Sequence, residues 1–313
     1  MTAENRADTL SPDEAFATLG NETRLSILQA LGEADRPVSF SALFDRVDAD
    51  DSGGFNYHLD RLVGHFVDKT TAGYELRQAG RRVVEAVLSG AVTDAPVVER
   101  TRLDQPCHYC GAPIEVSYRQ DRILKYCTAC PGRDQSPSGV PDAPVSGYLG
   151  SLPLPPAGVQ GRTAGEVYVA AWTWANLEFL AEAGGVCSRC SAALTESVSV
   201  CEAHADEGVC DRCGNRHAVQ FTADCPNCIN DLQGPFVLQL VSDTRLLHFL
   251  TAHGLNPVAP SRDAIAAVDR VHMDYEEDVR SVEPFEACFT FSVDGDTLSL
   301  TVDDDLDVVD AER

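Results

Sequence analysis

Six pairs of metal-binding side chains give this 313-residue chain its clearest capacity for chemistry. Five pairs have the spacing Cys-x-x-Cys and one has the spacing Cys-x-x-His. This spacing places two donor atoms on one tight turn, and two such turns supply the four ligands of a tetrahedral zinc ion. The sequence therefore predicts up to three zinc ions. The candidate ligands are Cys107, Cys110, Cys127, Cys130, Cys187, Cys190, Cys201, His204, Cys210, Cys213, Cys225 and Cys228.

The first four cysteines predict a zinc ribbon. Residues 114–118 and 123–126, between the two Cys-x-x-Cys units, alternate as short strands do, so we expect a hairpin that carries two ligands at each base. Gly111 permits the turn behind the first unit. His108 lies inside that unit, and we expect its side chain to be exposed rather than a fifth ligand.

The sequence does not decide which of the four ligand pairs between residues 187 and 228 bind the same zinc ion. Chain order joins the first pair with the second and the third with the fourth, giving one site of three cysteines with a histidine and one of four cysteines. A cross-braced arrangement, first with third and second with fourth, is the alternative. In both arrangements each ion has four protein ligands and no open position for water. We therefore expect structural ions and no enzymatic activity.

Two helices that meet at a sharp turn are expected in the N-terminal part. Ser39 is suited to cap the first, and residues 50–52 supply the turn. From Ser52 onward the apolar residues fall on one stripe, so Tyr57, Asp60 and Arg61 face outward and Asn56 lies on the flank. This is a helix-turn-helix pattern, whose second helix enters a major groove.

The residues that follow extend the pattern. Residues 66–69 and 74–76 read as two strands around a turn, and a further helix is expected from Arg77. Helices, hairpin and helix in this order are typical of a winged helix domain.

Three segments resemble the ArsR-type winged helix transcription regulators, in particular the forms of halophilic archaea with zinc-finger-like C-terminal extensions. They are FATLGNETRLSILQAL (16–31), FNYHLDRL (55–62) and YELRQAGRRVV (74–84). The ArsR-type resemblance covers residues 11–90, whereas the archaeal form extends over most of the chain. It implies a recognition helix over residues 52–64, a wing tip over 70–73, and a homodimer formed through the flanking helices.

The partner that the resemblance implies is double-stranded DNA. The residues expected to contact it are Ser52, Gly53, Asn56, Tyr57, Arg61, Lys69, Thr70 and Thr71. One departure matters, because no pair of cysteines occurs in the first ninety residues. The resemblance therefore implies a DNA-binding fold and does not imply arsenic or metal sensing.

The chain is strongly acidic, with 49 acidic against 24 basic residues, a formal net charge of -25, and only two lysines, Lys69 and Lys125. Such a composition suits a cytoplasm of molar salt, where charges are screened within a few Å. Duplex binding normally uses clustered basic residues that release counterions. We expect Arg61, Lys69, Arg77, Arg81 and Arg82 to form a local cluster, and DNA affinity to depend little on salt or to rise with it.

The compartment is expected to be cytoplasmic. No apolar run approaches the roughly 18 residues of a membrane span, and the N-terminus lacks a signal-peptide pattern. Cysteines in a reducing compartment are expected to bind metal rather than form disulfides.

The fold class expected is α+β in five segments. Residues 11–90 form the winged helix domain, 91–132 a linker and the first zinc ribbon, and 133–165 an irregular connector rich in proline and glycine. Residues 166–235 hold a helix with Trp172 and Trp174 and two zinc modules, and residues 236–313 form a small α+β region. The function expected is a DNA-binding transcription regulator, which takes an unknown effector or protein partner. The alternative is a zinc-stabilised interaction scaffold whose winged helix does not bind DNA.

Overall fold

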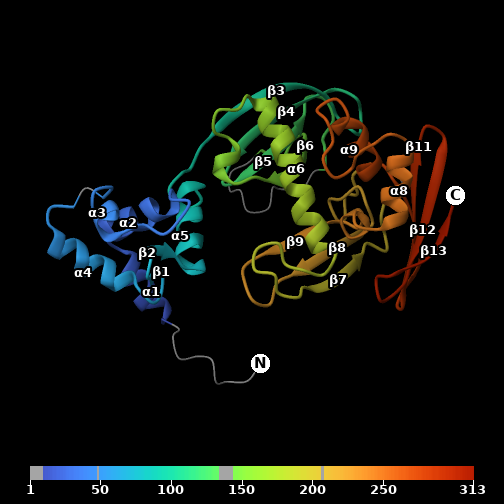
Figure 1. Cartoon of the computed structure of the whole chain (residues 1–313). Helices are drawn as coiled ribbons and strands as arrows, with labels where there is room; N and C mark the ends of the chain where they lie inside the picture. Colours follow the sequence, from blue (N-terminus) through green and yellow to red (C-terminus); the bar gives the residue numbers. More distant parts are fainter. Residues whose placement is uncertain (1–9, 48, 134–143, 206–207) are drawn as a thin grey trace. The chain divides into compact units, whose positions relative to one another are not determined.

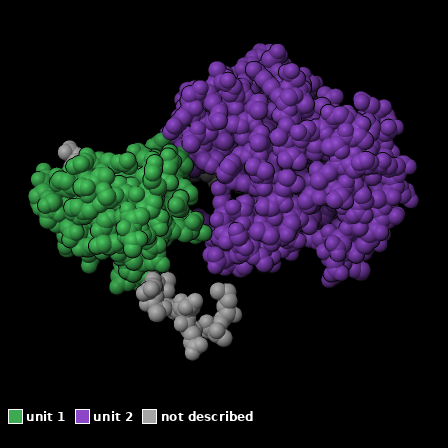
Figure 2. Space-filling model, viewed as in Figure 1, with its two compact units in different colours: residues 1–94 green, residues 95–313 purple. Residues whose placement is uncertain are grey.

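The computed structural model describes residues 10–47, 49–133, 144–205 and 208–313 (Figure 1). The chain divides into two compact units, residues 1–94 and 95–313 (Figure 2). Helices and antiparallel sheets occur together in the described residues, so the α+β class is confirmed. No helix among these residues is both long enough and apolar enough to cross a membrane.

The first unit consists of helices around one small hairpin. Its elements are α1 Pro12–Leu19, α2 Glu22–Gly32, α3 Phe40–Phe44, α4 Ser52–Leu62, β1 Val67–Thr70, β2 Gly73–Leu76 and α5 Gln78–Leu88. Ser39 caps α3, as expected, and Asp51 caps α4 through the backbone N–H groups of Gly53 and Gly54. The core is a cluster in which Phe55 of α4 packs edge-on against Phe40 and Phe44, with ring centroids 5.3 Å apart in both pairs.

The second unit begins with a four-stranded antiparallel sheet in the order β3-β4-β5-β6. Its strands are β3 Val98–Pro106, β4 Pro113–Arg119, β5 Arg122–Cys127 and β6 Tyr148–Pro153. Helix α6, Ala164–Glu182, packs on this sheet through Val167, Ala171 and Trp172. Figure 1 shows α6 beside these strands.

Two segments of this sheet differ from the sequence-based expectation. The expected linker contains β3, and the expected irregular connector contains β6. Both are edge strands. Most of β3 is exposed and polar, which hides its periodicity, and an edge position tolerates the glycine and proline of β6. The residues of the connector at 134–143 lie outside the described residues.

The rest of the second unit contains two further antiparallel sheets. Strands β7 Thr195–Val200, β8 Val219–Asp224 and β9 Asp231–Pro235 form a three-stranded sheet. Helices α7 Val237–Leu240, α8 Thr244–Ala252 and α9 Ile265–Met273 follow. The chain then forms the meander β10 Glu276–Val282, β11 Phe285–Val293, β12 Asp296–Val302 and β13 Val308–Glu312. Strands β11 and β12 form a tight hairpin in which Val293 pairs with Asp296.

One core joins these parts. One buried cluster contains Phe221 of β8, Phe289 of β11 and also Phe236. The rings of Phe236 and Phe289 stack with their centroids 4.5 Å apart. The C-terminal meander therefore packs against the sheet that lies between two of the cysteine groups. Burial of these aromatic side chains holds the cysteine-bearing loops on a rigid base.

Candidate functional site

Three clusters of cysteine and histidine side chains in the described residues could each hold a metal ion. Within each cluster the four donor atoms all lie within 4.8 Å of one another. All twelve ligands expected from the sequence belong to these clusters. The clusters are Cys107, Cys110, Cys127 and Cys130; Cys187, Cys190, Cys225 and Cys228; and Cys201, His204, Cys210 and Cys213.

The first cluster lies at the base of the β4–β5 hairpin, as the sequence predicts. The Sγ atoms are 3.8 Å apart between Cys107 and Cys130 and 3.4 Å apart between Cys110 and Cys127. A disulfide requires about 2.05 Å. Tetrahedral zinc with Zn–S bonds of about 2.3 Å requires S–S separations of roughly 3.8 Å. The donor atoms therefore fit four thiolates around one ion and do not fit disulfides.

The backbone around the first cluster favours a thiolate at Cys127. Gly111 has a φ of +73°, which allows the turn that closes the first Cys-x-x-Cys unit. The N–H groups of Ala129 and Cys130 donate to the Sγ of Cys127 at 3.3 and 3.2 Å. Burial opposes ionisation of this thiol, but these donors outweigh it and lower the pKa of Cys127 to about 7.

The other two clusters are nested, so chain order and the cross-braced alternative are both wrong. The outermost ligand pairs form one cluster, and the two inner pairs form the other. The cause is that β7 and β8 pair with each other, with Thr195 opposite Asp224 at one end and Val200 opposite Val219 at the other. The first end brings the outer pairs together, and the second end holds the inner pairs in its connecting loop.

The geometry of the nested clusters also fits tetrahedral coordination. Sγ atoms are 3.7 Å apart between Cys187 and Cys228 and 3.5 Å apart between Cys190 and Cys225. In the inner cluster the Sγ of Cys213 is 3.5 Å from Nδ1 of His204. The Nε2 of His204 lies 3.1 Å from the carbonyl oxygen of Arg216 and must donate to it, so Nδ1 is left free to bind a metal.

His108 is buried, so the expectation that it is exposed is wrong. Its Nδ1 lies 2.7 Å from Oδ2 of Asp269 in α9. Lys125 of β5 donates to both carboxylate oxygens of Asp269 at 3.2 and 3.3 Å. Burial opposes ionisation of Asp269, but the charge of Lys125 and the contacts with Lys125 and His108 outweigh it and hold the pKa of Asp269 well below the ordinary range. This network fastens the first Cys-x-x-Cys unit to α9.

Nothing in the local pattern pointed to Asp269, because it is one acidic residue among 49. Lys125 carried a weak signal as one of only two lysines in an acidic chain. Its partner comes from a distant helix, so only the tertiary structure identifies the pair.

The eight residues expected to contact DNA are all exposed, on α4 and around the β1–β2 turn. Tyr57 is 60 % exposed, whereas Phe55, Leu59 and Leu62 on the other side of α4 are buried. Asn56 donates to Asp60 at 2.9 Å, and the hydroxyl of Thr70 donates to the carbonyl of Gly73 at 3.1 Å. The outward side of α4 is thus free of contacts with the core. The side-chain amide of Asn56 on this side is hydrogen-bonded to the carboxylate of Asp60.

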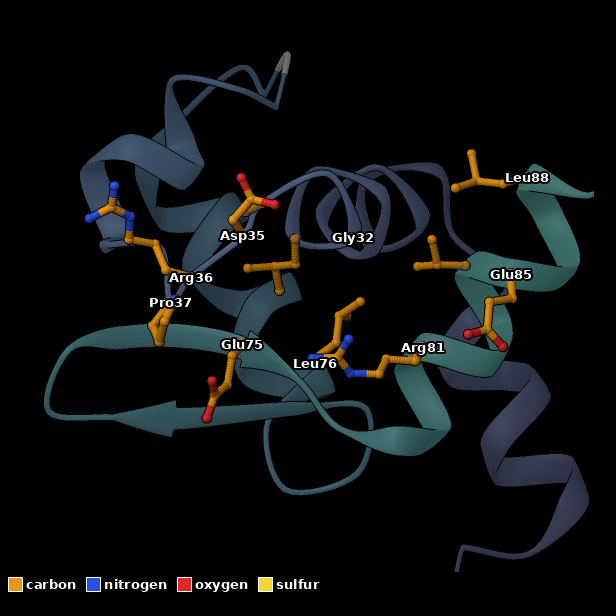
Figure 3. Close-up of a pocket in the computed structure, with 12 residues that line it drawn as sticks. Gly32, Asp35, Arg36, Pro37, Glu75, Leu76, Arg81, Glu85 and Leu88 are labelled. Atoms are coloured by element: carbon orange, nitrogen blue, oxygen red, sulfur yellow. The ribbon is translucent and has the colours of Figure 1, made fainter.

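The basic residues near α4 do not all point to one surface. Arg77 hydrogen-bonds to the carbonyl of Gly64 and forms an ion pair of 3.5 Å with Asp68. Lys69 lies over the ring of Tyr74, at 5.5 Å from its centroid. Arg81 lines a cleft of about 250 Å³ between the end of α2, β2 and α5, together with Glu75 and Glu85 (Figure 3). Arg61 is the basic residue that remains on α4 itself.

Comparison with known protein families gives two matches, one in each compact unit. A model described as a domain of unknown function (DUF7347) matches residues 12–87. A second, described as a domain of unknown function (DUF7351), matches residues 104–308. No curated protein and no solved structure matches the chain.

Proposed function

The chain belongs to the DUF7351 family, and from that premise we propose that it is a DNA-binding transcription regulator in which a metal-stabilised C-terminal unit follows a winged helix. In this proposal the first unit is a winged helix of the ArsR type, α4 is the recognition helix, and the β1–β2 hairpin is the wing. The order of the elements and the exposed side of α4 support it.

The exposed side of α4 is the single observation on which the proposal depends most. Asn56, Tyr57 and Arg61 face solvent, while the opposite side of the helix is completely covered by the core of the unit. A helix fixed from behind in this way can enter a major groove without rearrangement. Arg61 suits a guanine edge or a phosphate, and Tyr57 suits an apolar or phosphate contact.

The negative charge of the chain shapes how DNA binding is expected to work. Phosphate neutralisation normally drives duplex binding, and it weakens steeply with salt. In molar salt the free energy gained from neutralising phosphates is small for any protein. Fit in the groove and hydrogen bonds must therefore supply the affinity. We therefore propose a regulator of the halophilic cytoplasm whose affinity changes little between about 1 and 3 M KCl.

Fluorescence anisotropy of labelled duplexes at molar KCl tests the proposal. The unmodified chain is expected to bind the region upstream of its own gene more tightly than a scrambled duplex of equal length. R61Q removes a base or phosphate contact and is expected to lower the affinity about 10-fold or more. R102Q is the matched control, because Arg102 is an exposed arginine of β3 in the other unit.

Equal binding of upstream and scrambled duplexes would contradict the proposal. So would an equal loss of affinity in R61Q and R102Q, because the effect would then be one of net charge.

A homodimer is part of the proposal. Phe16 on α1 and Leu88 on α5, both in the helices that flank the expected recognition helix, are 75 % and 60 % exposed. A second copy that covers them would remove this surface from water. Sedimentation equilibrium of the F16D/L88D variant is expected to give monomers where the unmodified chain gives dimers.

We assign zinc to the three clusters, with a structural role. Thiolate and imidazole ligands in tetrahedral array select zinc among the common divalent ions. Zinc supplies four strong bonds that replace a larger hydrophobic core, and its binding is coupled to folding. No catalytic role is proposed, since each cluster already provides four ligands.

The scaffold alternative is supported by the charge pattern around α4. Asp60 engages Asn56, and Asp68 engages Arg77. These carboxylates repel phosphates and leave few free cations. If the chain is a scaffold, R61Q leaves its cellular function unchanged and no specific duplex is bound.

A further inference from the structure

The second unit contains a cavity of about 190 Å³ whose lining is unusually polar for a protein interior. Strands β6 and β9 and helices α6, α7 and α9 contribute residues to it. Seven of the fourteen buried polar or charged residues in the described part of the chain line this one cavity, among them Lys125, Asn176, Asp269 and His272. Interiors normally bury such groups only where they are paired, so this concentration calls for an explanation.

Six of these seven residues have hydrogen-bond or ion-pair partners among the described residues, and His272 has none. Among the described residues, neither ring nitrogen of His272 makes a hydrogen bond, although the side chain is buried. The amide of Asn176 donates to the carbonyls of Pro257 and Val258, whereas no described group donates to its Oδ1. Unsatisfied donors and acceptors beside a cavity are what a bound polar molecule completes.

Two basic side chains, those of Lys125 and Arg133, lie beside Gly150 of β6. Lys125 is the ladder partner of Gly150, and the guanidinium of Arg133 lies 3.8 Å from the position that a Cβ at Gly150 would occupy. The charge of Lys125 is matched by Asp269. Arg133 has no carboxylate at ion-pair distance within the described residues. A guanidinium beside a cavity, with no carboxylate partner among the described residues, favours a bound anion.

The other walls are apolar and the space is small. Trp172, Phe179, Leu149 and Leu238 line the cavity, so a ligand must also have an apolar part. Pockets that take drug-sized ligands measure about 300–1,000 Å³. The occupant is therefore smaller than such a ligand. In addition, β6 and β9 are edge strands, and an edge strand offers backbone N–H and C=O groups.

We propose that this cavity binds a small organic anion, with its carboxylate at Arg133 above Gly150 and its apolar body against Trp172. His272 and Asn176 hydrogen-bond to the polar groups of the ligand. This site is independent of DNA binding by the first unit, since every residue that forms it belongs to the second.

Isothermal titration of the full, zinc-loaded chain at constant KCl tests the proposal, with benzoate as the anionic probe and benzamide as its neutral counterpart. Benzoate is expected to bind saturably. Benzamide is expected to bind at least about 10-fold more weakly, because it lacks the charge that pairs with Arg133. No saturable heat with benzoate, or equal binding of the two probes, would overturn the proposal.

Two variants locate the anion. R133Q is expected to lower benzoate affinity about 10-fold or more, and R133K, which keeps the charge, is expected to lower it less. R102Q is the matched control, since Arg102 is an exposed arginine of β3 in the same unit and does not line the cavity. Unchanged binding in R133Q, or an equal loss in R102Q, would overturn the assignment. If R133Q fails to fold, the two probes on the unmodified chain still decide.

Discussion

Cys187 and Cys225 lie far apart in the chain but belong to one ligand cluster, whereas Cys201 belongs to another. The spacing of cysteines identifies ligands because a tight turn brings two donor atoms together locally. It does not identify which turns share an ion, since that depends on strand pairing. The ladder between β7 and β8 makes this choice by bringing residues 195 and 224 together.

Double substitutions distinguish the nested arrangement from the two others. C187S/C225S removes two ligands of one cluster and is expected to lower zinc content from three ions to two. C187S/C201S damages two clusters and is expected to lower it to one. Metal analysis by mass spectrometry of the purified variants measures this difference.

C288S provides the control, because Cys288 lies in β11 outside all three clusters. It is expected to retain three ions. Equal zinc loss in the two double variants would refute the nested pairing.

A second residue-scale prediction concerns Glu277, which accepts hydrogen bonds from the N–H groups of Ala218 and Val219 at 2.7 and 3.3 Å. Burial outweighs these donors and raises the pKa of Glu277 to about 7. A carboxyl group whose pKa is raised on folding contributes stability at low pH that is lost as pH rises from its unfolded to its folded pKa. The E277Q variant is therefore expected to gain stability relative to the unmodified chain between about pH 4.5 and 7, by roughly 3 kcal/mol.

His217, stacked on Tyr275 with centroids 4.2 Å apart, titrates in the opposite sense. Burial lowers the pKa of His217 to about 4, so its contribution to stability rises with pH up to its unfolded pKa. Because Nδ1 of His217 lies 3.6 Å from Oε1 of Glu277, the difference between E277Q and the unmodified chain, taken from urea unfolding at each pH, reports the carboxyl group together with its effect on His217. E276Q, at an exposed neighbour, is expected to show no such difference.

At the level of elements, the two sides of α4 are expected to have different roles. The buried side stabilises the first unit, and the exposed side contacts DNA. Phe55 is 1 % exposed and packs against two phenylalanine rings, so F55A is expected to destabilise the first unit by about 3–5 kcal/mol. Y57A is expected to change stability by less than about 0.5 kcal/mol because Tyr57 is exposed. Urea unfolding in molar KCl checks both values.

DNA binding is expected to reverse this order in conditions where both variants are folded. Y57A lowers affinity for the upstream duplex, whereas a folded F55A protein retains it. Loss of stability in Y57A comparable to that of F55A would show that Tyr57 packs against the core.

At the level of the whole molecule, the metal clusters all lie in the second compact unit. A chelator is therefore expected to unfold residues 95–313 and leave the first unit folded, since the buried cluster around Phe55 and Leu59 needs no ion. Hydrogen exchange measured by mass spectrometry checks this for each segment. Loss of protection in both units together would contradict it.

The sequence by itself determined the elements whose physical cause is local. Spacing along the chain identified the twelve ligand residues, the stripe of apolar residues identified both sides of α4, and a capping signal located Ser39. Each depends on residues a few positions apart, which a turn or a helix brings together in any context.

Only the tertiary structure decided what depends on contacts between distant segments. Strands β3 and β6 form because a neighbouring strand pairs with them, although their own patterns are weak. The nested ligand clusters follow from the β7–β8 ladder, and the burial of His108 follows from Asp269 on a helix far along the chain. The free energy of these features comes from long-range pairing and burial, which no short stretch of sequence contains.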